Sequence, residues 1–284
     1  MSLCHLVVTC PDRLGIVARV SSFIAEKGGS ITEANQHSDL ETGRFFMRYE
    51  IDTSAMGDKS DSIRQDFEPI AREFDMQWRW RDSRERPRRL MILVSRESHC
   101  LVDLLYRWTA GELGCEIAGV ISNHEDMKSL VEWHGIPWHH VPIDSNDRAQ
   151  GFARIERLVE ESEADTLVLA RYMQIIPPAL CQRYSGRIIN IHHSFLPSFA
   201  GARPYHQAYE RGVKLIGATC HYVTEDLDAG PIIEQDIQRV THCHTARDLI
   251  RLGRDIEKSV LARGVRWHLQ DRVLIHGNRT VVFA

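Results

Sequence analysis

Short apolar runs alternate with helical segments between residues 90 and 191, and this alternation constrains the fold most strongly. Strands that alternate with helices predict a parallel, doubly wound sheet, whose ligands bind at the carboxyl ends of the strands. The expected strands are residues 90–95, 116–122, 138–141, 166–170 and 187–191, and the expected helices are 100–111, 126–134, 148–161 and 178–184. Strands at 215–223 and 231–240 and a helix within 245–269 follow.

The first 80 residues have a different pattern. A strand at 3–9 precedes a helix at 12–27, which Asp12 can cap, and Gly28 and Gly29 end that helix. Strands at 30–39 and 44–51, a helix at 61–73 and a strand at 75–80 complete the order β-α-β-β-α-β. This order predicts a ferredoxin-like α+β sandwich.

An arginine-rich segment separates the two patterns. Residues 79–89 contain six arginines, one proline and no aliphatic residue, so they predict a linker or a solvated edge. We therefore expect a domain at 1–84, a linker at 85–89 and a second domain at 90–284, which makes the protein α/β with a small α+β domain in front.

Composition excludes several classes of protein. With 43% hydrophobic and 26% charged residues the chain is not disordered, and a net charge of −4 lacks the basic balance of a nucleic-acid-binding protein. We find no apolar run near the roughly 18 residues of a membrane span and expect no signal peptide. Seven scattered cysteines without a Cys-x-x-Cys motif predict buried apolar thiols in a reducing, cytoplasmic compartment.

Two polar clusters follow predicted strands. Asn190 and His192 end an apolar run and face the same side of a strand, where an amide can hold an oxyanion and an imidazole can move protons. Such residues at a strand end also commonly satisfy backbone groups. Asp228 lies in an acidic turn that ends in Ala-Gly-Pro after a second strand.

These motifs resemble the folate-dependent formyltransferase family. The resemblance rests on Asn-Ile-His at 190–192, Ser-Phe-Leu-Pro at 194–197 and Leu-Asp-Ala-Gly-Pro at 227–231, and it covers nearly all of residues 90–284. It implies a formyltransferase-type sheet with Asn190, His192 and Asp228 as catalytic residues, and it leaves open whether His192 or Asp228 carries the proton.

The same resemblance implies the substrate-binding residues. The pterin is expected against two loops, through Met173, Gln174, Ile175 and Ile176 and through Val223, Thr224 and Glu225. For Met173, Ile175 and Ile176, packing in the core is the alternative. His193 stands where transferases have a proline, and it either helps to hold water or only stacks behind His192.

The N-terminal unit resembles an ACT domain, a module that often binds amino acids. Its turn at 10–15 is similar to the effector loop of ACT domains, which implies an effector site at Asp12, Arg13, Leu14 and Gly15. Glycine and methionine are the candidate effectors, and ACT domains imply a homo-oligomer. Residues 42–48 and 277–280 are typical of a hydrolytic branch of the formyltransferase family.

Membership of that branch implies hydrolysis of 10-formyltetrahydrofolate to formate and tetrahydrofolate. The implied role of this reaction is to supply formate for purine synthesis and to balance the one-carbon pool. Transferases acting on glycinamide ribonucleotide cradle a phosphate in a Gly-Ser-Gly loop, whereas residues 95–100 contain no glycine and Glu97 repels phosphate. Arg96 could offset Glu97, so formyl transfer to a small amine is the alternative activity, and a non-catalytic amino-acid sensor is a third hypothesis.

No cofactor is expected, since 10-formyltetrahydrofolate is the substrate. No metal site is expected either, because the His-Glu-x-x-His motif of peptide deformylases is absent and His242 and His244 lack a partner set nearby.

Overall fold

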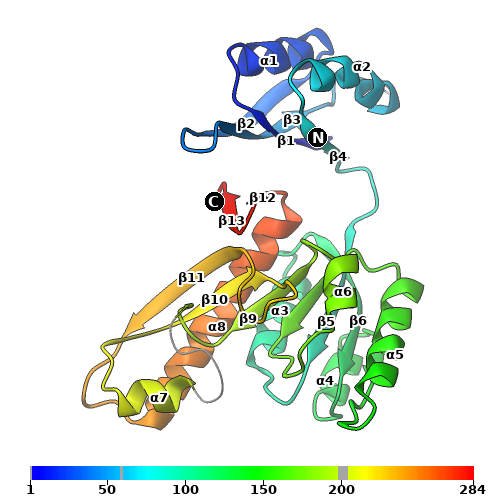
Figure 1. The fold of residues 1–284 in the computed structure, drawn as a ribbon. Coiled ribbons are helices and arrows are strands. Elements are labelled where there is room, and N and C mark those ends of the chain that lie inside the picture. Colours follow the sequence, from blue (N-terminus) through cyan, green and yellow to red (C-terminus); the bar gives the residue numbers. More distant parts are fainter. Residues whose placement is uncertain (1, 58–59, 198–203) are drawn as a thin grey trace. The chain divides into compact units, whose positions relative to one another are not determined.

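The chain folds into two compact units, which are described separately. The computed structural model describes residues 2–57, 60–197 and 204–284 (Figure 1). The first unit comprises residues Met1–Pro87, Gln270–His276 and Val281–Ala284, and the second comprises Arg88–Leu269 and Gly277–Thr280. The sequence prediction assigned all of 90–284 to the second domain, whereas the structure groups two C-terminal segments with the first.

The first unit has the expected ferredoxin-like order. Its elements are β1 (Leu3–Pro11), α1 (Ile16–Glu26), β2 (Ser30–Asp39), β3 (Arg44–Asp52), α2 (Ser60–Glu73) and β4 (Gln77–Asp82). The strands form an antiparallel sheet in the order β2-β3-β1-β4. The two helices pack their apolar residues on one face of this sheet.

The predicted cap of α1 is wrong. The helix begins at Ile16 after Gly15, which has a φ of +93°, and no side chain caps it. Asp12 is exposed, and its backbone N–H donates to the carbonyl of Gly43 instead. The glycine thus permits a left-handed turn that delays the start of the helix by one turn.

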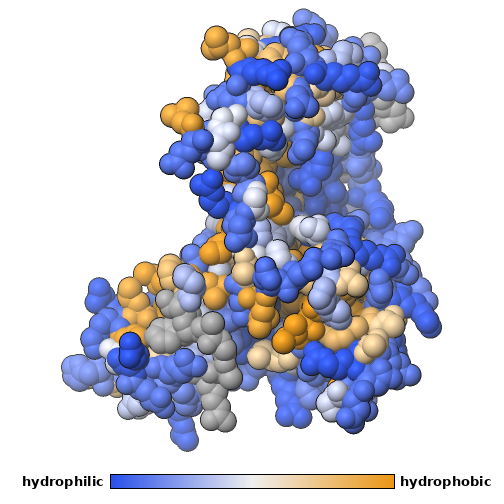
Figure 2. All heavy atoms as spheres, in the orientation of Figure 1, coloured by the Kyte–Doolittle hydropathy of each residue, from blue (hydrophilic) through white to orange (hydrophobic). Residues whose placement is uncertain are grey.

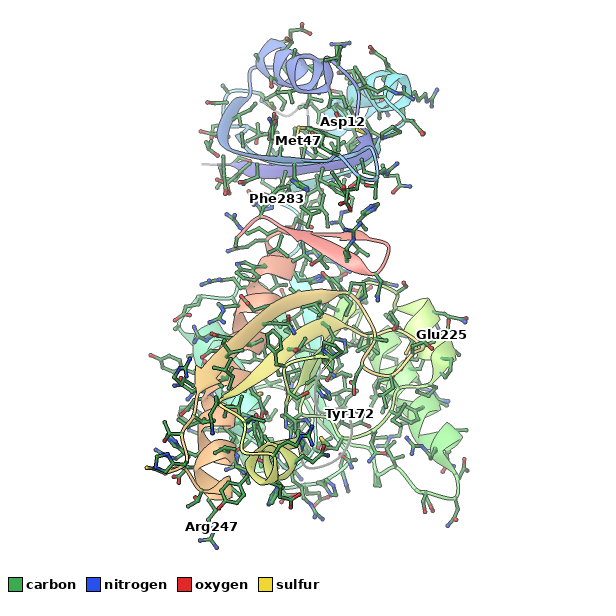
Figure 3. All side chains as sticks on the ribbon, turned by 60° about the vertical axis from the view of Figure 1, so that its left-hand side comes forward. Asp12, Met47, Tyr172, Glu225, Arg247 and Phe283 are labelled. Carbon is green, nitrogen blue, oxygen red and sulfur yellow. The ribbon has the colours of Figure 1, made fainter. Side chains whose placement is uncertain are left out.

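The C-terminal residues cover the second face of the first sheet. Val7, Phe46 and Leu274 form a buried cluster, against which Val281 and Phe283 pack. Figure 3 shows Phe283 on one side of the sheet and Met47 on the other. These residues belong to β12 (Val273–His276) and β13 (Arg279–Val282), which pair with each other. Cover on both faces explains why residues 45–49 of β3 are buried without interruption.

The second unit is a doubly wound sheet, as expected. Its elements are β5 (Arg88–Val94), α3 (His99–Thr109), β6 (Cys115–Ser122), α4 (Lys128–Trp133), β7 (Trp138–His140), α5 (Arg148–Glu161), β8 (Thr166–Ala170), α6 (Pro178–Arg183), β9 (Ile188–His192), α7 (Pro204–Glu210), β10 (Leu215–Tyr222), β11 (Ile232–Arg239) and α8 (Ala246–Leu269). The strand order is β11-β10-β9-β8-β5-β6-β7. Strands β5 to β9 run parallel, and β10 and β11 add antiparallel.

The arginine-rich segment is partly strand. Residues 79–82 belong to β4, and β5 already begins at Arg88, where it pairs with Cys115 of β6. β4 is an edge strand of its sheet, as the alternative of an edge allowed, whereas the linker expected at 85–89 overlaps β5 at Arg88 and Arg89. Strand pairing uses backbone groups and tolerates long polar side chains. Only residues 83–87 lie between the two strands.

Helix α8 packs along the antiparallel part of the sheet, against β9, β10 and β11, and also against α3. Two glycines let this helix approach its neighbours. A Cβ at Gly264 would lie 2.5 Å from the sulfur of Cys220 on β10, and one at Gly253 would lie 2.1 Å from the ring of Tyr205 on α7. In the described part of the chain, no helix combines the length and the apolar character needed to cross a membrane.

Candidate active site

The carboxyl ends of β8 and β9 and the turn after β10 border a cavity of about 640 Å³. Parallel sheets place ligand sites at this edge, where the strand order changes direction between β5 and β8. The cavity is lined by the predicted residues Asn190, His192, His193, Asp228, Met173, Gln174, Ile175, Ile176, Val223, Thr224 and Glu225, and by residues that the sequence analysis did not single out, namely His99, Tyr205, His221, Arg254 and Glu257.

Strand β9 positions Asn190 and His192. Ile188, Ile189 and Ile191 are buried and anchor the strand in the sheet, and the two polar residues emerge where it ends. Their spacing of two residues puts both on one face. His192 is itself buried, at 6% exposure, so its contacts are fixed by the protein rather than by solvent.

Asp228 reaches His192 from the turn after β10. Its backbone has a φ of +56°, and its Oδ2 lies 3.2 Å from Nδ1 of His192. The turn folds back closely on the strand, since a Cβ at Gly230 would lie 1.9 Å from the carbonyl oxygen of Tyr222. The hydrogen bond from His192 lowers the pKa of Asp228 despite the opposing effect of burial. The carboxylate is therefore ionised and accepts the Nδ1–H of His192.

This pairing leaves Nε2 of His192 as an acceptor. Among the described residues no group bonds to Nε2, although the atom is buried. A buried polar atom without a partner is uncommon, and in a cavity-lining ring it marks a position for a ligand or a water molecule. An imidazole whose Nδ1–H is bound by a carboxylate can take a proton at Nε2.

His193 lies next to His192, with ring centroids 5.2 Å apart. Burial and the positive charge of Arg171 lower the pKa of His193 to about 3, so the ring is neutral at physiological pH. Its other aromatic neighbour is Tyr205, at 6.1 Å between centroids. His193 therefore adds a neutral polar ring to the cavity wall.

The loop after β8 is tied to the end of β5. Oγ of Ser95 accepts the backbone N–H of Met173 and donates to Oδ1 of Asn123. In this loop Met173 and Ile175 are 57% and 59% exposed, whereas Ile176 is buried in the core. Core packing thus describes Ile176, while Met173 and Ile175 present apolar surface at the cavity. Apolar side chains interrupt the otherwise hydrophilic surface in Figure 2.

The turn after β10 supplies the opposite wall. Val223 is half-buried, Thr224 and Glu225 are exposed, and Thr224 Oγ1 donates to the carbonyl of Asp226. Glu225 is held by Nε2 of Gln182 at 2.8 Å. Figure 3 shows Tyr172 and Glu225 on the second unit, from the two loops that flank the cavity.

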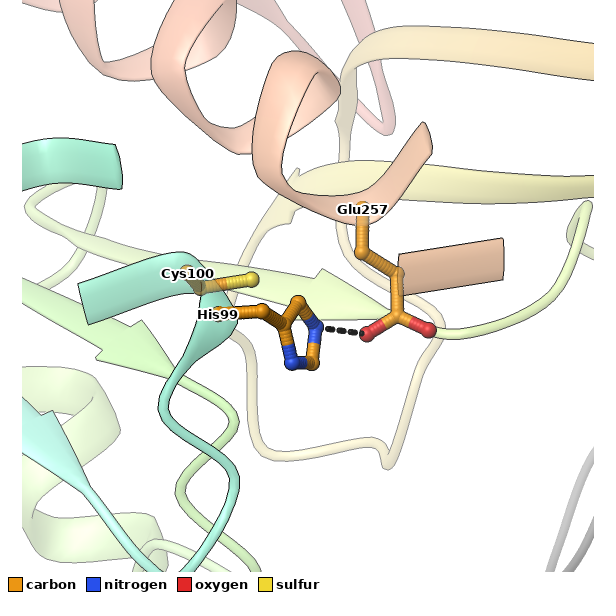
Figure 4. Close-up of side chains that lie close together, drawn as sticks. All are labelled: His99, Cys100 and Glu257. Carbon is orange, nitrogen blue, oxygen red and sulfur yellow. Dashed lines mark hydrogen bonds and ion pairs between the residues drawn. The ribbon is translucent and has the colours of Figure 1, made fainter. Parts of the chain in front are cut away.

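Glu257 of α8 forms a buried polar node at one end of the cavity. It bonds with Nε2 of His99 at 2.8 Å (Figure 4). It also accepts the hydroxyl of Tyr205 at 2.6 Å, and Nε of Arg171 lies 3.3 Å from the oxygen that His99 contacts. Glu97, at the same end, forms an ion pair with Arg254 at 2.7 Å. The carboxylates at this end therefore have cationic or hydrogen-bonding partners.

A metal ion fits this node poorly. Possible ligand atoms of His99, Cys100 and Glu257 lie within 4.8 Å of one another. However, both oxygens of Glu257 already have protein partners, and Arg171 places a positive charge beside one of them. Burial also raises the pKa of the Cys100 thiol well above its usual value, which disfavours the thiolate that a metal needs.

The predicted effector residues form an exposed segment of the first unit. Asp12, Arg13, Leu14 and Gly15 connect β1 to α1, and Leu14 is fully exposed. Nη1 of Arg13 donates to the carbonyl of Glu73 at the end of α2. Arg13 thus ties the segment to the end of α2, while the segment as a whole is exposed.

Sequence reasoning missed His221 and Glu257, and the signals differ. Glu257 interrupts the apolar stripe of α8 between Ile256 and Val260, so a charge within a buried face could have been noticed. His221 becomes informative only once β10 is known to pair with β9, which places it opposite Asn190.

Two family descriptions match this chain. Residues 88–265 match the formyl transferase family, and residues 5–59 match the ACT domain. The fold and the site therefore define a formyl transferase-type protein that carries an ACT domain.

Comparison with individual relatives identifies a narrower family within this class. The chain is 52% identical to a formyltetrahydrofolate deformylase of Bacillus subtilis over 98% of its own length and 93% of the relative's. The crystal structure of a formyltetrahydrofolate deformylase from Pseudomonas syringae superposes with a TM-score of 0.97 at 60% identity, covering 100% of this chain and 95% of that one. A glycinamide ribonucleotide transformylase from Symbiobacterium toebii gives a TM-score of 0.66 at 28% identity, over 72% of this chain and 97% of that one. The chain belongs to the formyltetrahydrofolate deformylase family.

Proposed function

We propose that this chain hydrolyses 10-formyltetrahydrofolate to formate and tetrahydrofolate. The observation that carries the proposal is the pairing of Asp228 with Nδ1 of His192, at 3.2 Å, which leaves Nε2 as an unpartnered acceptor on a cavity wall beside Asn190. Such an arrangement activates water, and the relatives' names state the substrate.

The reaction uses protein groups and water. Nε2 of His192 takes a proton from a water molecule as the water oxygen bonds to the formyl carbon. The carbonyl oxygen becomes an oxyanion, to which the side-chain N–H of Asn190 donates, and Asp228 stabilises the imidazolium. When the bond from carbon to N10 breaks, His192 returns the proton to N10, and formic acid loses its own proton to solvent.

The cavity favours water over a phosphorylated amine as the nucleophile. Glu97 and Glu257 line its far end, where their ion pairs with Arg254 and Arg171 engage cations that a phosphate would otherwise use. The apolar rim formed by Met173 and Ile175 suits a flat pterin, and we assign substrate contacts also to Gln174, Val223, Thr224 and Glu225. Ile176 supports the loop from the core. No cofactor enters the scheme.

Formate release with and without amines tests the proposal. Purified protein and 10-formyltetrahydrofolate in acceptor-free buffer should give equal amounts of formate and tetrahydrofolate. Turnover only after amines are added would make the protein a transferase. Absence of turnover in both cases, together with amino-acid binding, would make it a sensor.

We further propose that the ACT unit binds a small amino acid, glycine or methionine, at Asp12 to Gly15, and that the protein is a homo-oligomer through this unit. The exposed loop between β1 and α1 supports the site. Calorimetric titration with glycine and methionine should show binding to one of them that Asp12→Ala weakens. Light scattering should show a dimer or tetramer, and a monomer at micromolar concentration would contradict the assembly.

A further inference from the structure

His221 is a buried histidine in the middle of β10 that faces Asn190. The antiparallel register pairs His221 directly with Asn190 of β9, so their side chains share one face of the sheet. Nε2 of His221 lies 3.2 Å from Nδ2 of Asn190, and His221 is only 2% exposed. The contact is therefore fixed by the sheet and shielded from solvent.

The partners of His221 determine its tautomer. Nδ1 lies 2.9 Å from the backbone carbonyl of Tyr222, which can only accept, so Nδ1 carries a hydrogen. Burial lowers the pKa of His221, and the ring is neutral. Nε2 is consequently a bare acceptor. The carboxylate of Asp228 is also nearby, with Oδ1 at 3.8 Å from Nε2 of His221. Because this oxygen and Nε2 are both acceptors, no hydrogen bond joins them.

This acceptor selects one orientation of the Asn190 amide. An amide can rotate by a half-turn, which exchanges its oxygen and nitrogen. With a lone pair at Nε2 of His221, only the orientation that presents Nδ2 makes a hydrogen bond. Among the residues that the structure describes, none accepts the second N–H of Asn190. That N–H remains as the donor for a ligand in the cavity.

We propose that His221 is a positioning residue that holds the Asn190 amide with its N–H toward the reacting carbonyl oxygen. The inference rests on the proposed function and deepens it, since it assigns the group on which the oxyanion donor depends. His221 itself neither gives nor takes a proton in the reaction.

Two substitutions separate the acceptor from the shape of the ring. In His221→Gln the side-chain oxygen replaces Nε2 as an acceptor, and we expect kcat within about fivefold of wild type. In His221→Phe the space is filled without an acceptor, and we expect kcat to fall by about 10- to 100-fold with KM within about twofold, because a misplaced oxyanion donor affects the transition state. If the Phe variant does not fold, His221→Asn, which ends short of Asn190, replaces it.

A double-mutant cycle tests whether His221 acts through Asn190. In an Asn190→Ala background, His221→Phe should change kcat by less than about threefold, since the group it positions is gone. An equal loss in both backgrounds would overturn the proposal. A pH profile of His221→Gln that loses a limb of the wild-type profile would also overturn it, because that result would give His221 a proton-transfer role.

The tautomer can be measured without catalysis. Nitrogen-15 NMR of ring-labelled protein, with His221 assigned by its absence in His221→Gln, should show a neutral ring protonated at Nδ1. A ring protonated at Nε2 would overturn the inference even in an active enzyme. Conversely, the Nδ1–H tautomer in a protein that releases no formate would show that the proposed function alone had failed.

Discussion

Asn190 is the residue whose loss should affect the transition state most selectively. In the proposed reaction its amide donates to an oxyanion that does not exist in the bound substrate. We predict that Asn190→Ala lowers kcat by about 10²- to 10³-fold and changes KM little. Steady-state formate release measures both constants. The matched control is Asn146→Ala at an exposed position, which should leave both unchanged; a loss in KM alone for Asn190→Ala would contradict the assignment.

His193 should make the folded state sensitive to acid. Its pKa is about 3 in the folded protein, against about 6.5 when unfolded. Above pH 6.5 both states are neutral and His193 contributes nothing to the pH dependence. Between pH 6.5 and 3 the unfolded state binds the extra proton, so stability falls by up to about 1.4 kcal/mol per pH unit.

Urea unfolding at pH 7.5 and pH 5 tests this linkage. We predict that His193→Gln loses less stability than wild type between these two values, because the substituted side chain does not titrate. An exposed control, His242→Gln, should keep the wild-type decline. An unchanged decline in His193→Gln would contradict the burial effect.

At the scale of single residues, the sequence predicted the residues of the motifs but not the side chains that contact and position them. Asn190, His192 and Asp228 stand in recognisable motifs, and the structure brings them to one cavity. His221 could not be predicted, because its role depends on a strand register that no local pattern reveals. Glu257 was missed, although it interrupts the apolar stripe of α8. The start of α1 was also mispredicted. The preference of Asp for the N-cap pointed to Asp12, whereas Gly15 is the residue before the helix.

Helix α8 packs closely against Tyr205, which lines the cavity, because Gly253 has no side chain at the point of contact. At Gly253 a methyl group would overlap the ring of Tyr205, whose hydroxyl bonds to Glu257. We predict that Gly253→Ala destabilises the protein by about 1–3 kcal/mol through overpacking.

The control for this substitution is Gly114→Ala, at a glycine where a Cβ would meet nothing within 4 Å. Its effect on the midpoint of urea unfolding should stay within about 0.5 kcal/mol. If both variants unfold at the same urea concentration as wild type, the close approach of α8 and α7 is not required.

The alternation of strands and helices was sufficient to predict the parallel sheet, because apolar residues are spaced differently along a strand and along a helix. It could not give the direction of β10, since an antiparallel strand at the edge of a parallel sheet has the same local pattern as a parallel one. That direction decides the site, because it sets His221 opposite Asn190 and returns Asp228 to His192.

At the scale of the whole molecule, the C-terminal segment stabilises the first unit. Arg48 is 1% exposed, and its partner Glu33 also binds Arg272 of the C-terminal segment. Burial raises the pKa of Glu33, but hydrogen bonds from Arg272 and Asn35 outweigh it and lower the pKa to about 2. Glu33 therefore stays charged and holds two cations.

We predict that Glu33→Gln destabilises this unit by about 2 kcal/mol, because it leaves the buried Arg48 with weaker partners. Hydrogen exchange should show faster opening of β12. Glu41→Gln, at an exposed glutamate of the same unit, is the control and should leave exchange unchanged. Equal exchange in both variants would contradict the stabilising role of Glu33.

The order of the two domains could be predicted from the arginine-rich segment. The packing of the C-terminal segments on the first unit could not be predicted. Leu274, Val281 and Phe283 are apolar residues whose partners, Val7 and Phe46, stand more than 200 positions earlier in the sequence. Nothing local indicates such a contact, so the sequence assigned these residues to the nearer domain.

Release of formate by the wild type and by Asp228→Asn, in buffer without an amine acceptor, tests the central claim most directly. An amide at this position is neutral and can present its N–H to Nδ1 of His192, so it neither fixes the tautomer nor stabilises the imidazolium, and water activation should fail. We predict stoichiometric formate and tetrahydrofolate from the wild type and a loss of about 10³- to 10⁴-fold in the variant. Equal rates for the two proteins, or no formate from the wild type until an amine is added, would contradict it.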